Sequence, residues 1–159
     1  MLHIDIICVG KLKEAYLKEA ILEYQKRLSK YCVLQIIELQ DEKVPNQINN
    51  TIISEIKNKE SNQILRHIKK DSYIIALDLN GKQFSSEQFS EKLTSISLSH
   101  SRITIIIGGT LGMSQELLHA CNESICFSKM TFPHQLIRVF LLEQLFRAFK
   151  IANHEIYHR

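Results

Sequence analysis

The stretch Arg102-Ile103-Thr104-Ile105-Ile106-Ile107-Gly108-Gly109-Thr110-Leu111-Gly112 joins the most strongly buried strand pattern of the chain to three of its five glycines. Residues 102–107 are rich in isoleucine and do not alternate, which is typical of a strand buried on both faces of a parallel sheet. In open α/β sheets, ligands bind beyond the carboxyl ends of strands, where glycines let a ligand approach the backbone. The stretch therefore predicts an α/β fold with a cofactor loop at 108–112. A tight turn is the alternative, since the spacing matches neither the dinucleotide fingerprint nor a P-loop.

The same alternation of strand and helix patterns continues along the whole chain. Apolar or β-branched runs predict further strands at 4–9, 33–39, 73–79 and 124–127. Helical spacing predicts helices over about 12–28, 48–68, 85–96, 114–122 and 133–151. This order favours a single α/β domain over residues 1–159, with a mainly parallel sheet and helices on both faces.

Two local details follow from these patterns. The first helix is expected to bury the side chains that recur near helical spacing, namely Leu12, Tyr16, Ala20, Tyr24 and Leu28. The turn pair Asn80-Gly81 is expected to close the strand that begins at Tyr73.

Composition limits where the protein works. Hydrophobic residues make up 45% of the chain and charged residues 23%, which is ordinary for a globular protein. The longest apolar runs fall far short of the roughly 20 residues that span a bilayer. Residues 1–5 include an acid where a signal peptide would carry basic residues. We therefore expect a cytoplasmic protein with no membrane partner.

The four cysteines are Cys8, Cys32, Cys121 and Cys126. They show neither C-x-x-C spacing nor the density of a disulfide scaffold, so we expect reduced core residues. Cys121 and Cys126 make a metal pair conceivable, but His119 is the only nearby helper and the spacing is unlike that of zinc sites. We predict no metal site.

Positive charge is concentrated at the two ends of the chain. Residues 11–30 hold six Lys and Arg against three Glu, and residues 128–159 hold five against two. Residues 31–127 hold nine against eleven acids. Such a distribution suits an anionic partner such as RNA, because phosphate contacts supply much of the affinity. A solvated surface helix explains the first cluster equally well.

Two further segments concentrate polar and aromatic groups. Phe127 to His134 leads into a helix whose first turn can accept Pro133, and the free amides there could receive a polar ligand. The chain ends in Tyr157-His158-Arg159, whose side chains can stack on and hydrogen-bond to a splayed RNA base. Ordinary helix entry and a frayed terminus are the alternatives.

The helix predicted at 133–151 is apolar over most of its circumference. Its apolar residues are Leu136, Ile137, Val139, Phe140, Leu141, Leu142, Leu145, Phe146, Ala148 and Phe149. One sheet face cannot easily cover so much surface, and a subunit interface is the economical place to bury it. We therefore predict a homodimer.

Motifs spread from end to end of the chain share one resemblance. They are Gly10-Lys11-Leu12-Lys13, Leu77-Asp78-Leu79-Asn80-Gly81-Lys82, Ser85-Ser86-Glu87, Ile107 to Gly112, Ser128 to His134, Arg138, Glu143 to Ala148 and Tyr157-His158-Arg159. In combination they resemble the RlmH family of bacterial ribosomal RNA large-subunit methyltransferases, within the SPOUT superfamily. The resemblance implies a SPOUT-type fold with a carboxyl-terminal trefoil knot, a rare exception to the rule against knotted chains. It also implies a homodimer that methylates N3 of a pseudouridine in 23S rRNA within the assembled ribosome.

The resemblance also assigns residues to roles. S-adenosyl-L-methionine would lie in the knot, lined by Leu77, Gly108, Phe127, Ser128, Lys129, Met130, Thr131 and Phe132. Tyr157, His158 and Arg159 would be catalytic and face the target base, beside a cofactor held mainly by the partner subunit. We expect His158 to handle the proton and Arg159 to stabilise developing negative charge on the base. His134 is the competing base.

Two positions depart from the family pattern. Leu111 stands in the glycine loop where relatives usually carry a polar or acidic residue, and Glu155-Ile156 stand where many have a proline before the tyrosine. Leu111 supports an alternative function, a catalytically weakened paralogue that serves as a ribosome-binding protein. A SPOUT enzyme for transfer RNA would more often carry an added RNA-binding domain, for which this chain lacks room.

Overall fold

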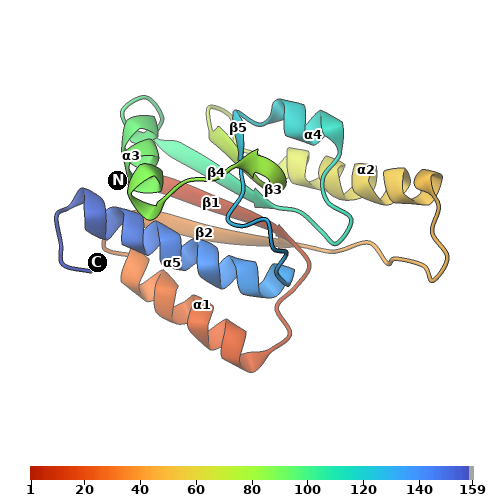
Figure 1. Ribbon diagram of the computed structural model, residues 1–159, viewed down its shortest axis with the longest axis horizontal. Coiled ribbons are helices and arrows are strands. Elements are labelled where there is room, and N and C mark those ends of the chain that lie inside the picture. Colours follow the sequence, from red (N-terminus) through yellow and green to blue (C-terminus); the bar gives the residue numbers. More distant parts are fainter. Residues whose placement is uncertain (158–159) are drawn as a thin grey trace.

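Five parallel strands form one sheet, in the order β2-β1-β4-β3-β5. In the computed structural model, which describes residues 1–157, the strands are β1 (Leu2–Val9), β2 (Cys32–Leu39), β3 (Tyr73–Lys82), β4 (Arg102–Ile107) and β5 (Glu123–Ile125). The helices are α1 (Ala15–Leu28), α2 (Asn50–His67), α3 (Ser86–Ser97), α4 (Gln115–Ala120) and α5 (His134–Ala152). The predicted single α/β domain is confirmed, and the sheet is parallel throughout the described residues (Figure 1).

The isoleucine-rich strand β4 lies in the middle of the sheet. β4 pairs with β1 on one side and with β3 on the other. Ile103, Ile105 and Ile107 belong to the core on one face, while Ile106 belongs to the core on the other. The continuous isoleucine run is explained by this burial on both faces.

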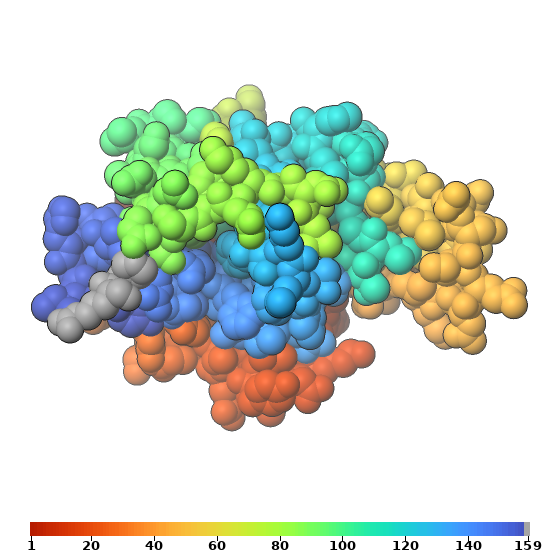
Figure 2. All heavy atoms as spheres, viewed as in Figure 1, coloured from red at the N-terminus to blue at the C-terminus, as the bar shows by residue number. Residues whose placement is uncertain are grey.

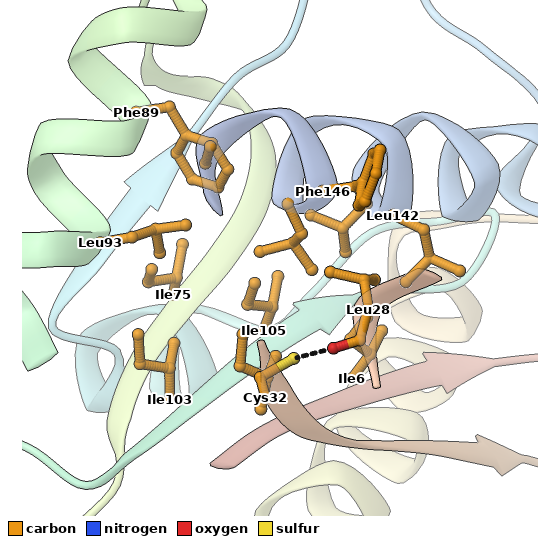
Figure 3. Packing of buried hydrophobic residues seen from close by; sticks show 14 of the residues in the cluster. Ile6, Leu28, Cys32, Ile75, Phe89, Leu93, Ile103, Ile105, Leu142 and Phe146 are labelled. Carbon is orange, nitrogen blue, oxygen red and sulfur yellow. Dashed lines mark hydrogen bonds between the residues drawn. The ribbon is translucent and has the colours of Figure 1, made fainter. Parts of the chain in front are cut away.

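Helices cover both faces of the sheet, as predicted. The larger core lies under α1, α3 and α5, where Leu28, Phe89 and Leu142 meet side chains of β1, β3 and β4 (Figure 3). The smaller core lies under α2 and α4, which contribute Ile64 and Leu117.

Two local predictions were wrong. Leu28 is buried as predicted, but Tyr16 is 67% exposed, and Leu17 and Ile21, which were not predicted, are the other residues that α1 buries. Asn80 and Gly81 do not end their strand, because β3 continues to Lys82 after a shift in its pairing with β5. A Cβ on Gly81 would lie 2.6 Å from the backbone of Ile125, so this glycine serves a close approach between strands.

Other helices of the same chain cover more of the apolar surface of α5 than the sequence led us to expect. The helix lies between α1 and α3, and the Tyr24 hydroxyl of α1 donates to Glu143 at 2.6 Å while the Ser90 hydroxyl of α3 donates to the Ala148 carbonyl at 2.7 Å. Phe132 and Phe140, whose rings meet edge to face, keep 38% and 37% of their surface exposed. Among the large apolar side chains of α5, Phe140 is the exposed one, and it lies near the start of the helix.

The structure also bears on the cysteines, on metal binding and on membrane insertion. All four cysteines are free, and burial raises the pKa of Cys8 to about 12. No group of three or more metal-ligating side chains is gathered among residues 1–157. No helix in the described part of the chain has the length and apolar character needed to cross a membrane.

Candidate functional site

A pocket of about 790 Å³ opens at the carboxyl ends of β3, β4 and β5. Three segments surround it: residues 77–80 of β3, the glycine loop with its flanks at 107–113, and residues 125–134 between β5 and α5. Lys57 of α2 and Ile137 of α5 also line it. Its position is the one expected for a ligand site in an open parallel sheet.

The glycine loop has a geometry that side chains would disturb. The Gly112 N–H donates to the Gly109 carbonyl at 3.0 Å, and Gly112 has a φ of 86°, in the region that favours glycine. A Cβ on Gly108 would meet the Met113 side chain at 2.9 Å. The loop therefore presents bare backbone to the pocket.

Helix α2 supports this loop from behind. The Ser61 hydroxyl accepts a hydrogen bond from the Ser114 N–H at 2.9 Å, and Ser114 in turn is the N-cap of α4. The neighbouring Glu60 side chain packs against Gly109. Both ends of the loop are thus fixed to one helix.

The segment between β5 and α5 is held mainly by backbone groups. The Cys126 N–H donates to the Lys82 carbonyl at 3.0 Å, and the Met130 N–H donates to the Ser128 hydroxyl at 3.0 Å. Pro133 precedes the helix, and its carbonyl accepts from the Leu136 N–H at 3.0 Å. Figure 2 shows residues of this segment, in blue, between the green region near residue 80 and the red-orange amino-terminal region.

The structure gathers most residues that the resemblance assigned to a cofactor. The pocket is lined by Leu77, Gly108, Phe127, Ser128, Met130, Thr131 and Phe132. Lys129 belongs to the same loop and is exposed, but its side chain does not line the pocket.

Two ionisable side chains that sequence reasoning did not place in a cofactor site, Lys57 and Asp78, also line this pocket. His134, which ends the predicted ligand segment, lines it as well. Burial, followed by the nearby Arg138 guanidinium, lowers the pKa of His134 and favours its neutral form. Asp78 could have been found, because it follows Leu77 at the carboxyl end of a strand. Lys57 gives no such signal, since it comes from the middle of a polar helix.

Arg138 links the first turns of α5 to the end of β1. Its buried guanidinium donates to the Gly10 carbonyl at 2.6 Å and to Glu38 at 2.7 Å. The Lys13 N–H adds a longer contact of 3.3 Å to Gln135. The basic loop at 10–13 is thereby fixed beside the segment that lines the pocket.

The described part of the tail lies away from the pocket. The chain turns back at His154, which has a φ of 56°, and the Tyr157 hydroxyl donates to Glu143 at 2.9 Å. The Tyr157 ring meets Phe146 edge to face at 5.1 Å between centroids. Glu143 lies nine residues after His134, or about 14 Å along the helix. Predicted catalytic residues His158 and Arg159 lie outside the described residues.

Glu143 organises this second cluster. Burial alone would raise the pKa of its carboxyl, but hydrogen bonds from Tyr24, Arg147 and Tyr157 outweigh burial and lower that pKa. The Arg147 guanidinium also lies 4.9 Å from the centroid of the Tyr157 ring. The sequence motif 143–148 was noted, but its role in holding the tail was not predicted.

Comparison with known proteins gives one consistent result. The model of a family described as "Predicted SPOUT methyltransferase" matches residues 2–158. A protein of Clostridium novyi named ribosomal RNA large subunit methyltransferase H is 55% identical, with 99% of this chain and 100% of that protein covered. Proteins with the same name from Clostridium botulinum and Clostridium acetobutylicum are 54% and 53% identical over the same shares of both chains.

Proposed function

The chain belongs to the SPOUT methyltransferase family, and from this premise we propose that it transfers a methyl group from S-adenosyl-L-methionine to large-subunit ribosomal RNA. The names of its relatives supply the RNA class. The observation that carries the proposal is the pocket at the strand ends, which brings the glycine loop and the segment 127–132 together. We place the activity on the assembled ribosome in the cytoplasm, at N3 of a pseudouridine.

The residues of the pocket fit a sulfonium nucleoside. Ile107, Ile125 and Phe127 offer apolar walls for a flat base, and the three glycines of the loop let a ligand approach the backbone closely. Asp78, Ser128 and Thr131 supply polar groups that can orient a ribose and an amino-acid end. A volume of about 790 Å³ lies in the usual range of small-molecule sites. When bound, the cofactor supplies a methyl group on a positively charged sulfur.

The chain's own residues must then align the acceptor and remove its proton. Fixing donor and acceptor in a reactive geometry supplies several kcal/mol by itself. In our proposal His158 takes the imino proton of the base, and Arg159 stabilises the negative charge that develops on it. The neutral imidazole of His134 faces the pocket and acts in cofactor binding.

We further propose that the functional unit is a knotted homodimer. Tyr157 contacts Glu143 and Phe146, so it does not line its own pocket. The exposed Phe132 and Phe140 lie next to the pocket-lining segment and suit a subunit contact. A tail contributed by the partner subunit would complete the site, and a trefoil knot in the carboxyl-terminal part would hold the cofactor.

Mass spectrometry of ribosomal RNA tests this function. RNA from cells that lack the protein should have lost one methyl-pseudouridine, and purified protein with S-adenosyl-L-methionine should restore it on isolated ribosomes. Restoration only on intact ribosomes, and not on free rRNA, supports the assembled substrate. An unchanged modification profile favours the alternative, a ribosome-binding protein, for which the half-buried Leu111 in the pocket lining is the specific observation.

A further inference from the structure

Glu60 is a buried carboxyl group directly behind the glycine loop. Its residue surface is only 4% exposed. One carboxyl oxygen, Oε2, accepts a hydrogen bond from the Glu42 N–H at 2.9 Å. The other oxygen, Oε1, has no hydrogen-bond partner among the described residues. A buried polar atom without a partner costs free energy, so its persistence points to a role in function.

The unpartnered oxygen faces the wall of the pocket. A Cβ on Gly109 would lie 2.5 Å from Oε1, and Gly109 itself lines the pocket. The carboxyl group is therefore separated from the pocket by little more than a glycine backbone. Because protein rather than water fills that space, a charge on Glu60 is poorly screened there.

The surroundings of Glu60 disfavour its ionised form, which a cation bound nearby would favour. Burial raises the pKa of its carboxyl, and the nearby Asp41 and Glu42 raise it further, against the opposing hydrogen bond from the Glu42 backbone. Lys57, one turn earlier on α2, lines the pocket, but no ion pair joins it to Glu60. Asp78 and the neutral form of His134 complete the ionisable lining.

We propose that Glu60 is a specificity-determining residue that makes the pocket favour the cationic methyl donor over its neutral product. This inference rests on the proposed function. S-adenosyl-L-methionine and S-adenosyl-L-homocysteine differ by one methyl group and by the positive charge on sulfur. The Glu60 carboxylate attracts that charge through Gly109 and gains nothing from the thioether. Loss of the charge on transfer then weakens binding of the product and speeds its release.

Isothermal titration calorimetry with both compounds measures this preference as a ratio of dissociation constants. Glu60→Gln keeps the size of the side chain and an oxygen that can accept from Glu42, so we expect a folded protein. Its preference for the donor should fall about tenfold, the effect of removing one nearby charge at an intermediate dielectric. Glu55→Gln, an exposed carboxyl on the same helix, is the matched control and should leave the ratio unchanged.

Charge sign and pH separate an electrostatic role from a purely structural one. Lys57→Met removes a cation from the lining and should shift the ratio in the opposite direction. The difference in donor preference between wild type and Glu60→Gln should shrink as the pH falls through the Glu60 pKa, because protonation removes the charge from the wild-type side chain. Both proteins contain His134, so its titration does not contribute to that difference. Equal weakening of both compounds in Glu60→Gln, or a pH-independent difference, overturns the inference alone. A wild-type protein that binds neither compound removes the proposed function and this inference together.

Discussion

The two ends of α5 hold functional segments in different ways. At its start, the segment that lines the pocket is fixed by backbone hydrogen bonds and by the close approach of Gly81 to Ile125, and the buried Arg138 ties the helix to Gly10. At its other end, backbone hydrogen bonds hold residues 153–155, but Tyr157 is held by side chains on a partly exposed surface, chiefly through Glu143. Backbone geometry fixes the pocket in advance, whereas side-chain contacts can be exchanged. We therefore expect the pocket to be the preformed part of the site, and the contacts of Tyr157 to be the part that can be exchanged.

Arg159→Ala is the strongest way to break this comparison. If the tail acts only on the base, single-turnover methylation of ribosomes should fall by roughly 10²–10³-fold, because a preorganised charge at the base is lost. Affinity for S-adenosyl-L-methionine should stay within about twofold of wild type. Calorimetry and quenched single-turnover assays measure the two quantities separately. A large loss of cofactor affinity would show that pocket and tail are one unit.

Gly81→Ala should break the other side of the comparison, the preformed pocket. The new Cβ would lie 2.6 Å from the backbone of Ile125, and backbone cannot move as a side-chain end can. We expect a loss of about 2–3 kcal/mol in the free energy of unfolding and weaker cofactor binding, since residues 77–80 and 125–128 both line the pocket. Urea denaturation provides the measurement. Asn80→Ala, at the exposed neighbouring position, is the control and should change stability by less than about 0.5 kcal/mol.

The elements of the fold could be predicted because local patterns decide them. β4 was predicted with its observed bounds, and the helix predicted to start near residue 85 begins there with a capping box formed by Ser85 and Gln88. The errors arose where tertiary contacts override local preference. Asn80-Gly81 has the composition of a turn, but the close approach to β5 keeps it extended. Tyr16 is apolar enough to be buried, yet no element covers its side of α1.

The candidate site could be predicted only in part. The glycine loop and the segment from Phe127 follow strands, and ligands of open α/β sheets bind beyond the carboxyl ends of strands, so both segments could be predicted. Glu60 and Lys57 come from α2, whose contact with the loop depends on packing across the sheet edge. The position of Tyr157 depends on a chain reversal at His154, whose backbone lies in the left-handed region. No sequence pattern predicted this reversal. Contacts between distant segments are what single-sequence patterns do not contain.

Glu143→Gln sharpens the comparison at the tail end. Because the folded pKa of Glu143 is lowered, its ionised form stabilises the protein above the ordinary carboxyl range, and that stability is lost as the pH falls through the folded pKa. The variant should lose about 1 kcal/mol at neutral pH and show a flatter decline in stability as the pH falls below the ordinary carboxyl range. Thermal unfolding across this range measures both. Cofactor affinity should not change, and a matching loss there would contradict the independence of the two ends.

Leu111→Asn has the smallest expected effect and tests the pocket end in the opposite direction, by improving it. Leu111 belongs to the glycine loop, is half-buried and lines the pocket, and the preceding Thr110 is exposed to solvent. An amide at this position can add one hydrogen bond to the cofactor or to RNA, worth about 1 kcal/mol, or up to about fivefold in affinity. Titrations with S-adenosyl-L-methionine and with ribosomes show which ligand gains. Leu111→Met keeps the apolar character and controls for a change of shape. If the amide raises methylation far beyond fivefold, the leucine has restrained a competent enzyme, and the weakened paralogue becomes the better description of the natural chain.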